Sequence, residues 1–153
     1  MNEGQVQIVR LDPMRVICFS GFGSSPEEIA LQKLRDWAGA HGARGRVFGF
    51  NNPNPAPGSP NYGYDVWMVV DETAQPEGEG QLLDFAGGLY AVARCAVHDP
   101  GKDIGAAWQA LVRWAEGNGH ELGSHQWLEE QITFLSAADG EDFILDLFLP
   151  LKA

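Results

Sequence analysis

An internal repeat constrains the fold of this chain more than any other feature of its sequence. Residues 15–42 align without a gap on residues 92–119, at the constant spacing that separates Cys18 from Cys95 (95 − 18 = 77). The identical pairs are Cys18/Cys95, Ala30/Ala107, Gln32/Gln109, Leu34/Leu111, Trp37/Trp114, Ala38/Ala115 and Gly42/Gly119. Two amphipathic helices can agree by coincidence, but a duplication explains the matches better. We therefore expect one domain over 1–153, with repeats at about 5–74 and 81–152.

Each repeat is predicted to run strand, helix, strand, strand. Ser25-Pro26 and Gly42 are typical of the start and end of the first helix, and Asp12-Pro13 of a bend in the strand before it. The predicted strands are 6–19, 46–50, 64–70, 89–97, 126–134 and 143–149, and the predicted helices are 26–41 and 103–118. A segment with four prolines at 51–61 is either a solvated connection or a lid.

The net charge of −11 limits the partners of the chain. Nucleic acids and anionic membranes attract Lys and Arg, so an acidic chain favours cationic ligands or basic partners instead. The apolar runs are too short to span a bilayer, and the N-terminus has no signal-peptide pattern, so we expect a cytoplasmic protein. In that compartment Cys18 and Cys95 are expected to be reduced, buried thiols.

Three familiar site motifs are incomplete in this sequence. The run Gly21 to Pro26 lies where a phosphate loop would lie, but it lacks the third glycine and a Walker lysine. The run His120 to His125 has the wrong spacing for a helical zinc site, and no Gly-x-Ser-x-Gly nucleophile elbow is present. The sequence therefore predicts no metal and no cofactor.

Aromatic and acidic residues alternate with apolar ones on the predicted strands. Asp65 and Trp67 share one strand face, Asp146 and Phe148 share the matching face of the last strand, and Trp127 lies with Glu129. Asn51 aligns with Glu129 in the repeat. One sheet face is thus expected to pack on both helices, while the other carries aromatics and carboxylates, either as a solvated face or as a site. Indole walls around a desolvated carboxylate, whose pKa would be raised, suit a lipophilic cation.

Five runs in order resemble a known family. They are Tyr62-Gly63-Tyr64-Asp65-Val66-Trp67, Gly87-Gly88-Leu89-Tyr90-Ala91-Val92, Leu111-Val112-Arg113-Trp114, His125-Gln126-Trp127-Leu128-Glu129-Glu130 and Leu145-Asp146-Leu147-Phe148-Leu149-Pro150. Together they resemble the GyrI-like small-molecule-binding domain, also known as the effector-binding domain of AraC- and MerR-type transcription activators. The resemblance spans about 6–152.

This resemblance implies a fold and a pocket residue. The fold is α+β, with two β-α-β-β modules related by a pseudo-twofold, a curved antiparallel sheet, two helices on one face and a ligand groove on the other. The family's pocket glutamate, in a pattern of aromatic, Glu, any residue, Tyr, maps to Glu129. Leu128 and Gln131 replace the aromatic and the tyrosine, and Glu130 is a possible substitute for Glu129.

Three functions follow from the resemblance and the residues. The first is a binding module for a flat, lipophilic, cationic small molecule, with these ligand-binding residues: Glu129, Trp127, Trp67, Asp65, Phe148, Asn51 and Asp146. The alternative is a hydrolase of cyclopropane-containing DNA alkylators, with Glu129 as the general base for a water held by Asn51 or Asp65. The third is a gyrase-inhibitor-type interaction module that uses acidic residues at 139–142. We expect the chain to lack the family's DNA-binding half, and we therefore expect no direct nucleic-acid binding and a monomer or homodimer.

Overall fold

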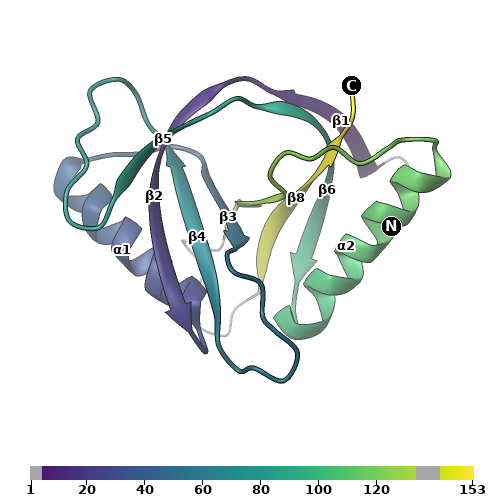
Figure 1. Ribbon diagram of the computed structural model, residues 1–153, viewed down its shortest axis with the longest axis horizontal. Helices are drawn as coiled ribbons and strands as arrows, with labels where there is room; N and C mark the ends of the chain where they lie inside the picture. Colours follow the sequence, from purple (N-terminus) through teal and green to yellow (C-terminus); the bar gives the residue numbers. More distant parts are fainter. Residues whose placement is uncertain (1–4, 134–141) are drawn as a thin grey trace. The chain divides into compact units, whose positions relative to one another are not determined.

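The computed structural model describes residues 5–133 and 142–153. These residues form two compact units, each with antiparallel strands and one helix (Figure 1). The first unit is Pro13–Phe85, and the second unit combines Met1–Asp12 with Ala86–Ala153. The chain therefore crosses between the units twice, once after Asp12 and once after Phe85.

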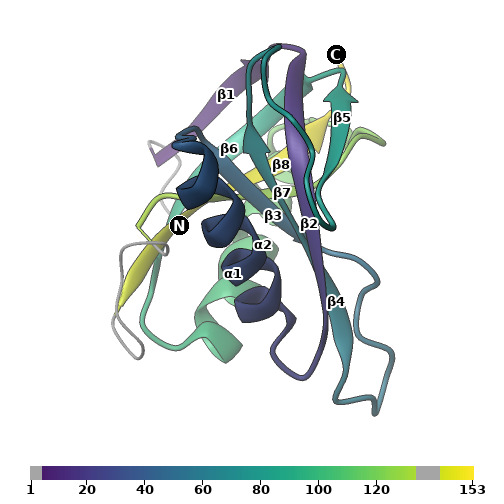
Figure 2. The same cartoon turned by 90° about the vertical axis from the view of Figure 1, so that its left-hand side faces the viewer.

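The first unit contains four strands and a helix. They are β2 (Met14–Gly23), α1 (Pro26–His41), β3 (Val47–Asn51), β4 (Tyr62–Val69) and β5 (Gln81–Phe85). The strands lie in the order β3-β4-β2-β5, and every neighbouring pair is antiparallel. Figure 2 shows α1 running along the strands of this unit.

The second unit repeats this arrangement. Its elements are β1 (Val6–Leu11), β6 (Gly88–Val97), α2 (Pro100–Gly117), β7 (Leu128–Gln131) and β8 (Phe143–Leu151). The strand order β7-β8-β6-β1 matches β3-β4-β2-β5 element for element, again with antiparallel pairs. The predicted α+β fold with two β-α-β-β modules is confirmed. Part of the strand predicted at 126–134 lies outside the described residues.

The expectation of one bent strand over 6–19 is wrong. The structure has two strands there, and they belong to different units, because β1 pairs with β6 whereas β2 pairs with β4 and β5. Pro13 has no N–H to continue the ladder, so the chain can change partners at this point. Gly87 makes room for the crossing, since a Cβ there would lie 2.1 Å from the carbonyl oxygen of Leu11. The strand β5 was not expected from the sequence.

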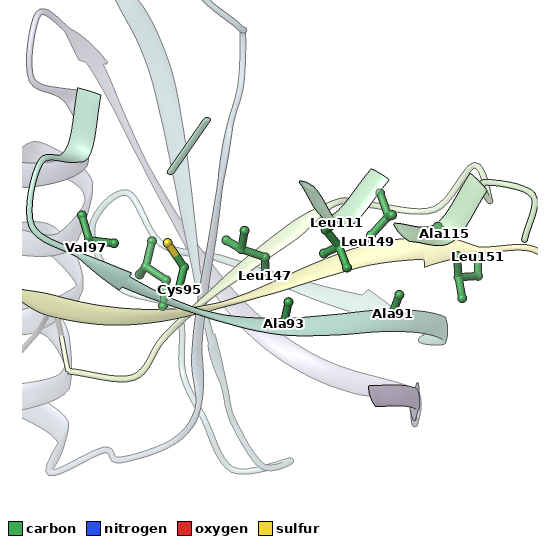
Figure 3. Packing of buried hydrophobic residues seen from close by; sticks show 10 residues of the cluster. Ala91, Ala93, Cys95, Val97, Leu111, Ala115, Leu147, Leu149 and Leu151 are labelled. Carbon is green, nitrogen blue, oxygen red and sulfur yellow. The ribbon is translucent and has the colours of Figure 1, made fainter. Parts of the chain in front are cut away.

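Each helix covers one face of its unit's sheet. In the first unit, the Trp37 ring of α1 lies 6.3 Å from the Phe19 ring of β2. Phe19 pairs with Val66, so Val66 and its neighbours Tyr64 and Met68 face the helix, while Asp65 and Trp67 face away, as predicted. In the second unit, Leu111 and Ala115 of α2 pack on alternate residues of β6 and β8 (Figure 3). These residues are Ala91, Ala93, Cys95, Val97, Leu145, Leu147, Leu149 and Leu151.

The helix ends follow the expected chemistry in part. Pro26 opens α1 after Ser25, and Gly42 closes it in the left-handed conformation at φ 62°, but the Ser25 side chain makes no capping hydrogen bond. The helix α2 begins at Pro100, three residues before the predicted start. There the Asp103 carboxylate accepts hydrogen bonds from the backbone N–H groups of Asp99 and His98, both at 2.9 Å, which lower the pKa of Asp103.

The strand registers correct the alignment of the two repeats. Cys95 lies in the core under α2, whereas Cys18 lies on the face turned away from α1, so this identical pair is not structurally equivalent. Asp65 of the first unit and Asp146 of the second unit, in contrast, are structurally equivalent to each other. Asp65 pairs with Ser20 of β2, and Asp146 pairs with Arg94 of β6, which makes Ser20 and Arg94 counterparts. Both cysteines are buried free thiols, as expected.

Replacing Leu147 by alanine tests the assignment of the core. Leu147 is fully buried, so Leu147→Ala is expected to lower the free energy of unfolding by about 2–5 kcal/mol in urea denaturation. Leu83→Ala is the matched control, since Leu83 lies exposed on β5 and its truncation should cost less than about 1 kcal/mol. Equal losses in the two variants would contradict this core.

Candidate functional site

The predicted site residues lie on two opposite faces of their sheets. Glu129 pairs with Leu147 of the helix-facing core, and Asn51 shares the face of Val47 and Gly49. The remaining strand residues, Asp65, Trp67, Asp146 and Phe148, lie on the faces turned away from the helices. The expectation that Glu129 shares a face with Asp146 and Phe148 is therefore wrong. Because side chains alternate along a strand, Glu130 takes that place, opposite Asp146.

Trp127 and Glu129 lie together, as predicted, but against the helix α2. The Trp108 indole of α2 donates a hydrogen bond from Nε1 to Oε2 of Glu129, at 3.1 Å. The Trp108 and Trp127 rings are 5.2 Å apart between centroids and tilted by 45°. We call these three residues the Trp108 cluster. Trp127 is 39% exposed, so solvent reaches the cluster.

Sequence reasoning missed the role of Trp108. The helical spacing of Ile104, Trp108 and Leu111 predicts that Trp108 faces inward, and its side chain does pack against the core of the second unit. The side chain is half-buried, and its polar edge reaches across to β7. Only the packing of α2 on the sheet reveals that contact, because 21 positions separate Trp108 from Glu129.

The Trp108 cluster joins aromatic surface to a fixed carboxylate. The hydrogen bond from Trp108 holds the Glu129 side chain in one orientation. An organic cation beside Trp127 would meet the negative face of an indole ring and a negative charge within the same cluster.

Asp146 already carries its own counter-charge. The Arg94 guanidinium binds it with two hydrogen bonds, from Nε to Oδ1 at 2.9 Å and from Nη2 to Oδ2 at 3.2 Å. These bonds and the Asp146 charge raise the pKa of Arg94, and Glu130 raises it further. Phe148 is buried against Tyr90, with ring centroids 5.5 Å apart. This face of the second unit is thus charge-compensated at Asp146 and closely packed at Phe148.

Asp65 is bound by two neutral donors. The Ser20 hydroxyl donates to Oδ1 at 2.6 Å, and the Asn52 amide donates to Oδ2 at 3.0 Å. Asp65 is 8% exposed and Trp67 is 7% exposed. The Trp67 ring packs edge-on against Phe50, with centroids 5.0 Å apart, and its Nε1 has no hydrogen-bond acceptor among the described residues.

Two further observations concern other classes of site. Within 5–133 and 142–153, no three His, Cys, Asp or Glu side chains gather so that they could hold a metal ion. No helix in the same ranges is long and apolar enough to cross a membrane. Of the acidic residues predicted for a protein partner, Asp139 and Glu141 lie outside the described residues, and Asp142 pairs with His98 at 2.7 Å.

The comparisons with known proteins identify relatives of this chain. The family model described as GyrI-like small molecule binding domain matches residues 4–152. No curated protein matches the sequence.

Three solved structures share the fold at low identity. A hydrolase from Listeria innocua has a TM-score of 0.71 at 10% identity, covering 97% of this chain and 92% of that one. The EcmrR C-terminal domain has a TM-score of 0.64 at 15% identity, covering 97% of each chain. SAV2435 bound to tetraphenylphosphonium has a TM-score of 0.55 at 11% identity, covering 97% of this chain and 94% of that one.

The environment of Cys18 predicts its reactivity. Burial, followed by the Asp65 charge, raises the pKa of the Cys18 thiol to about 11, so the group is protonated at pH 8. Iodoacetamide at pH 8 is therefore expected to leave Cys18 unmodified in the native protein and to alkylate it in urea. Peptide mass spectrometry measures both states, and rapid alkylation of native Cys18 would show that the thiol is exposed.

Proposed function

Because this chain belongs to the GyrI-like small molecule binding domain family, we propose that it binds a lipophilic organic cation at the Trp108 cluster. The observation that carries the proposal is that the exposed Trp127 ring and the Glu129 carboxylate both contact Trp108. Trp108 contacts both residues and so fixes their relative positions. In this proposal Trp127 supplies stacking surface and Glu129 supplies the counter-charge.

Each interaction is expected to contribute modestly to the free energy of binding. A cation over an indole face contributes roughly 0.5–2 kcal/mol, depending on how fully both groups are desolvated. An ion pair near the surface contributes up to about 1 kcal/mol. Burial of aromatic ligand surface supplies the rest of the affinity. Charge therefore acts mainly as a selectivity element, which separates cations from neutral analogues.

The structure bound to tetraphenylphosphonium supports this ligand class. That neighbour was solved with a lipophilic cation, and its fold is similar to that of this chain. Tetraphenylphosphonium has no hydrogen-bond donor, so a protein recognises it by aromatic surface and negative charge. The Trp108 cluster offers both. Asn51, Trp67, Asp65, Phe148 and Asp146 are not needed by the proposal.

Tetraphenylphosphonium binding should depend on Glu129 and not on Glu130. Titration followed by tryptophan fluorescence is expected to show affinity up to about fivefold lower for Glu129→Gln, equivalent to about 1 kcal/mol. Glu130→Gln is the matched control, because Glu130 is the next residue of β7 and lies on the opposite face. Its affinity should equal that of the wild type.

A neutral ligand completes this test. Triphenylphosphine oxide has similar aromatic rings and no net charge, so its affinity should be the same in wild type and Glu129→Gln. If Glu129→Gln weakens the neutral and the cationic ligand equally, Glu129 has no counter-charge role. If Glu130→Gln alone loses affinity, the site lies on the other face of β7.

A second candidate function is hydrolysis at the same cluster. Two solved structures of similar fold are described as hydrolases, and Glu129 lies beside an aromatic surface that can hold a polycyclic substrate. In the proposed reaction Glu129 takes a proton from water while the water oxygen bonds to a cyclopropane carbon. The strained C–C bond breaks, its electron pair passes to the conjugated ring system, and the proton returns there from Glu129.

The hydrolase hypothesis predicts that the protein turns over the alkylator catalytically and does not merely bind it stoichiometrically. Wild-type protein incubated with an excess of a cyclopropane-containing alkylator should form many molecules of product per protein molecule. Mass spectrometry detects this product, which is heavier than the alkylator by one water. Glu129→Gln should yield only the background amount. Recovery of unchanged alkylator from the wild type would leave the binding function alone.

A further inference from the structure

The two units differ in how they neutralise one equivalent aspartate. In the second unit, Asp146 receives the forked guanidinium of Arg94 from the neighbouring strand. In the first unit, Asp65 faces Ser20 at the counterpart position, so the cationic group of the second unit is replaced by a hydroxyl. The local strand pairing is the same, but the positive charge is missing.

The Asp65 charge stays uncompensated within the described residues. Its hydrogen bonds come from the Ser20 hydroxyl and the Asn52 amide, and no described basic side chain forms an ion pair with it. Lys33 reaches the backbone of this strand, where Nζ donates to the Ser20 carbonyl at 2.8 Å, but its ion pair is with Glu79 at 3.0 Å. A carboxylate that is nine-tenths buried is costly without a cation.

We propose that Asp65 and its surroundings form a second binding site, which takes a small organic cation with N–H donors, such as an alkylguanidinium. The cation occupies the place that Arg94 fills in the second unit. There it donates to the Asp65 carboxylate in the two-bond geometry that Arg94 makes with Asp146. The proposal is independent of the Trp108 cluster, which belongs to the other unit.

The approach to Asp65 is open at its two donors. Ser20 and Asn52 are both exposed, so the carboxylate lies one side chain below the surface. The Arg94 side chain is itself 61% exposed, which shows that a guanidinium at the equivalent place can be reached from solvent. In this proposal the ligand takes the volume by which the arginine side chain exceeds that of serine.

Aromatic side chains next to Asp65 select for an alkyl group on the cation. Phe50 lies directly opposite Asp65 on β3 and is half-buried. Phe22 follows Ser20 on the same face of β2 and is 62% exposed. A short alkyl chain can lie along these rings while the charged end binds Asp65. A quaternary phosphonium has no N–H donors, so it does not suit this site.

Two charge-swapping variants test the proposal with n-propylguanidinium as the probe. Isothermal titration calorimetry of the wild type should give one site, and n-propylurea, which is neutral, should not bind. In Ser20→Arg the new side chain fills the site, so the affinity should fall at least tenfold. In Arg94→Ser the equivalent volume beside Asp146 opens, so the stoichiometry should rise to two.

Further variants separate this site from the Trp108 cluster and from misfolding. Glu129→Gln should bind the probe as the wild type does, even if it loses tetraphenylphosphonium. Asp65→Asn should lose the probe, and its thermal unfolding shows whether it is folded. Ser20→Arg keeps the test valid if Asp65→Asn does not fold. The proposal is overturned if the wild type does not bind the probe, if Ser20→Arg binds it unchanged, or if Glu129→Gln abolishes binding.

Discussion

Side chains alternate between the two faces of each antiparallel sheet, and one face of each sheet packs against a helix. This alternation determines which residues are buried in the core and which lie on the opposite face. In each unit, every second residue of the central strands packs against the helix and forms the core. The remaining residues lie on the opposite face of the sheet, and the strand register determines which of them are neighbours on that face. Asp65, Asp146 and Glu130 therefore lie on one type of face, and Glu129 lies on the other. A shift of one residue in β7 would exchange the two glutamates.

This constraint explains why the acidic residues have different chemistry. Glu129 reaches the edge of α2, where Trp108 orients it beside an exposed indole. Asp146 lies opposite a strand residue that carries a positive charge, so its charge is compensated within the sheet. Asp65 has only neutral donors. Asp146 thus forms a structural ion pair, whereas the roles proposed above are a ligand contact for Glu129 and a cation site for Asp65.

The sequence was sufficient for the fold class, for α1 and for the strand at 64–70, but not for the division of 6–19 into β1 and β2. The alternation over 64–70 is long enough to place Asp65 and Trp67 on the face away from the helix, and the Pro and Gly signals place both ends of α1. The strand β7 has only four residues, Leu-Glu-Glu-Gln, and carries a glutamate on each face, so its pattern cannot decide which glutamate faces α2. The Arg94–Asp146 pair and the Trp108–Glu129 contact depend on register and helix packing, which no local pattern encodes.

The most direct test is a crystal structure of the protein with tetraphenylphosphonium. The phosphonium is expected to lie against the Trp127 indole and closer to the Glu129 carboxylate than to any other acidic side chain. Electron density for the cation beside Asp65, or on the Phe148 face of β8, would contradict the assignment of the Trp108 cluster as the counter-charge site.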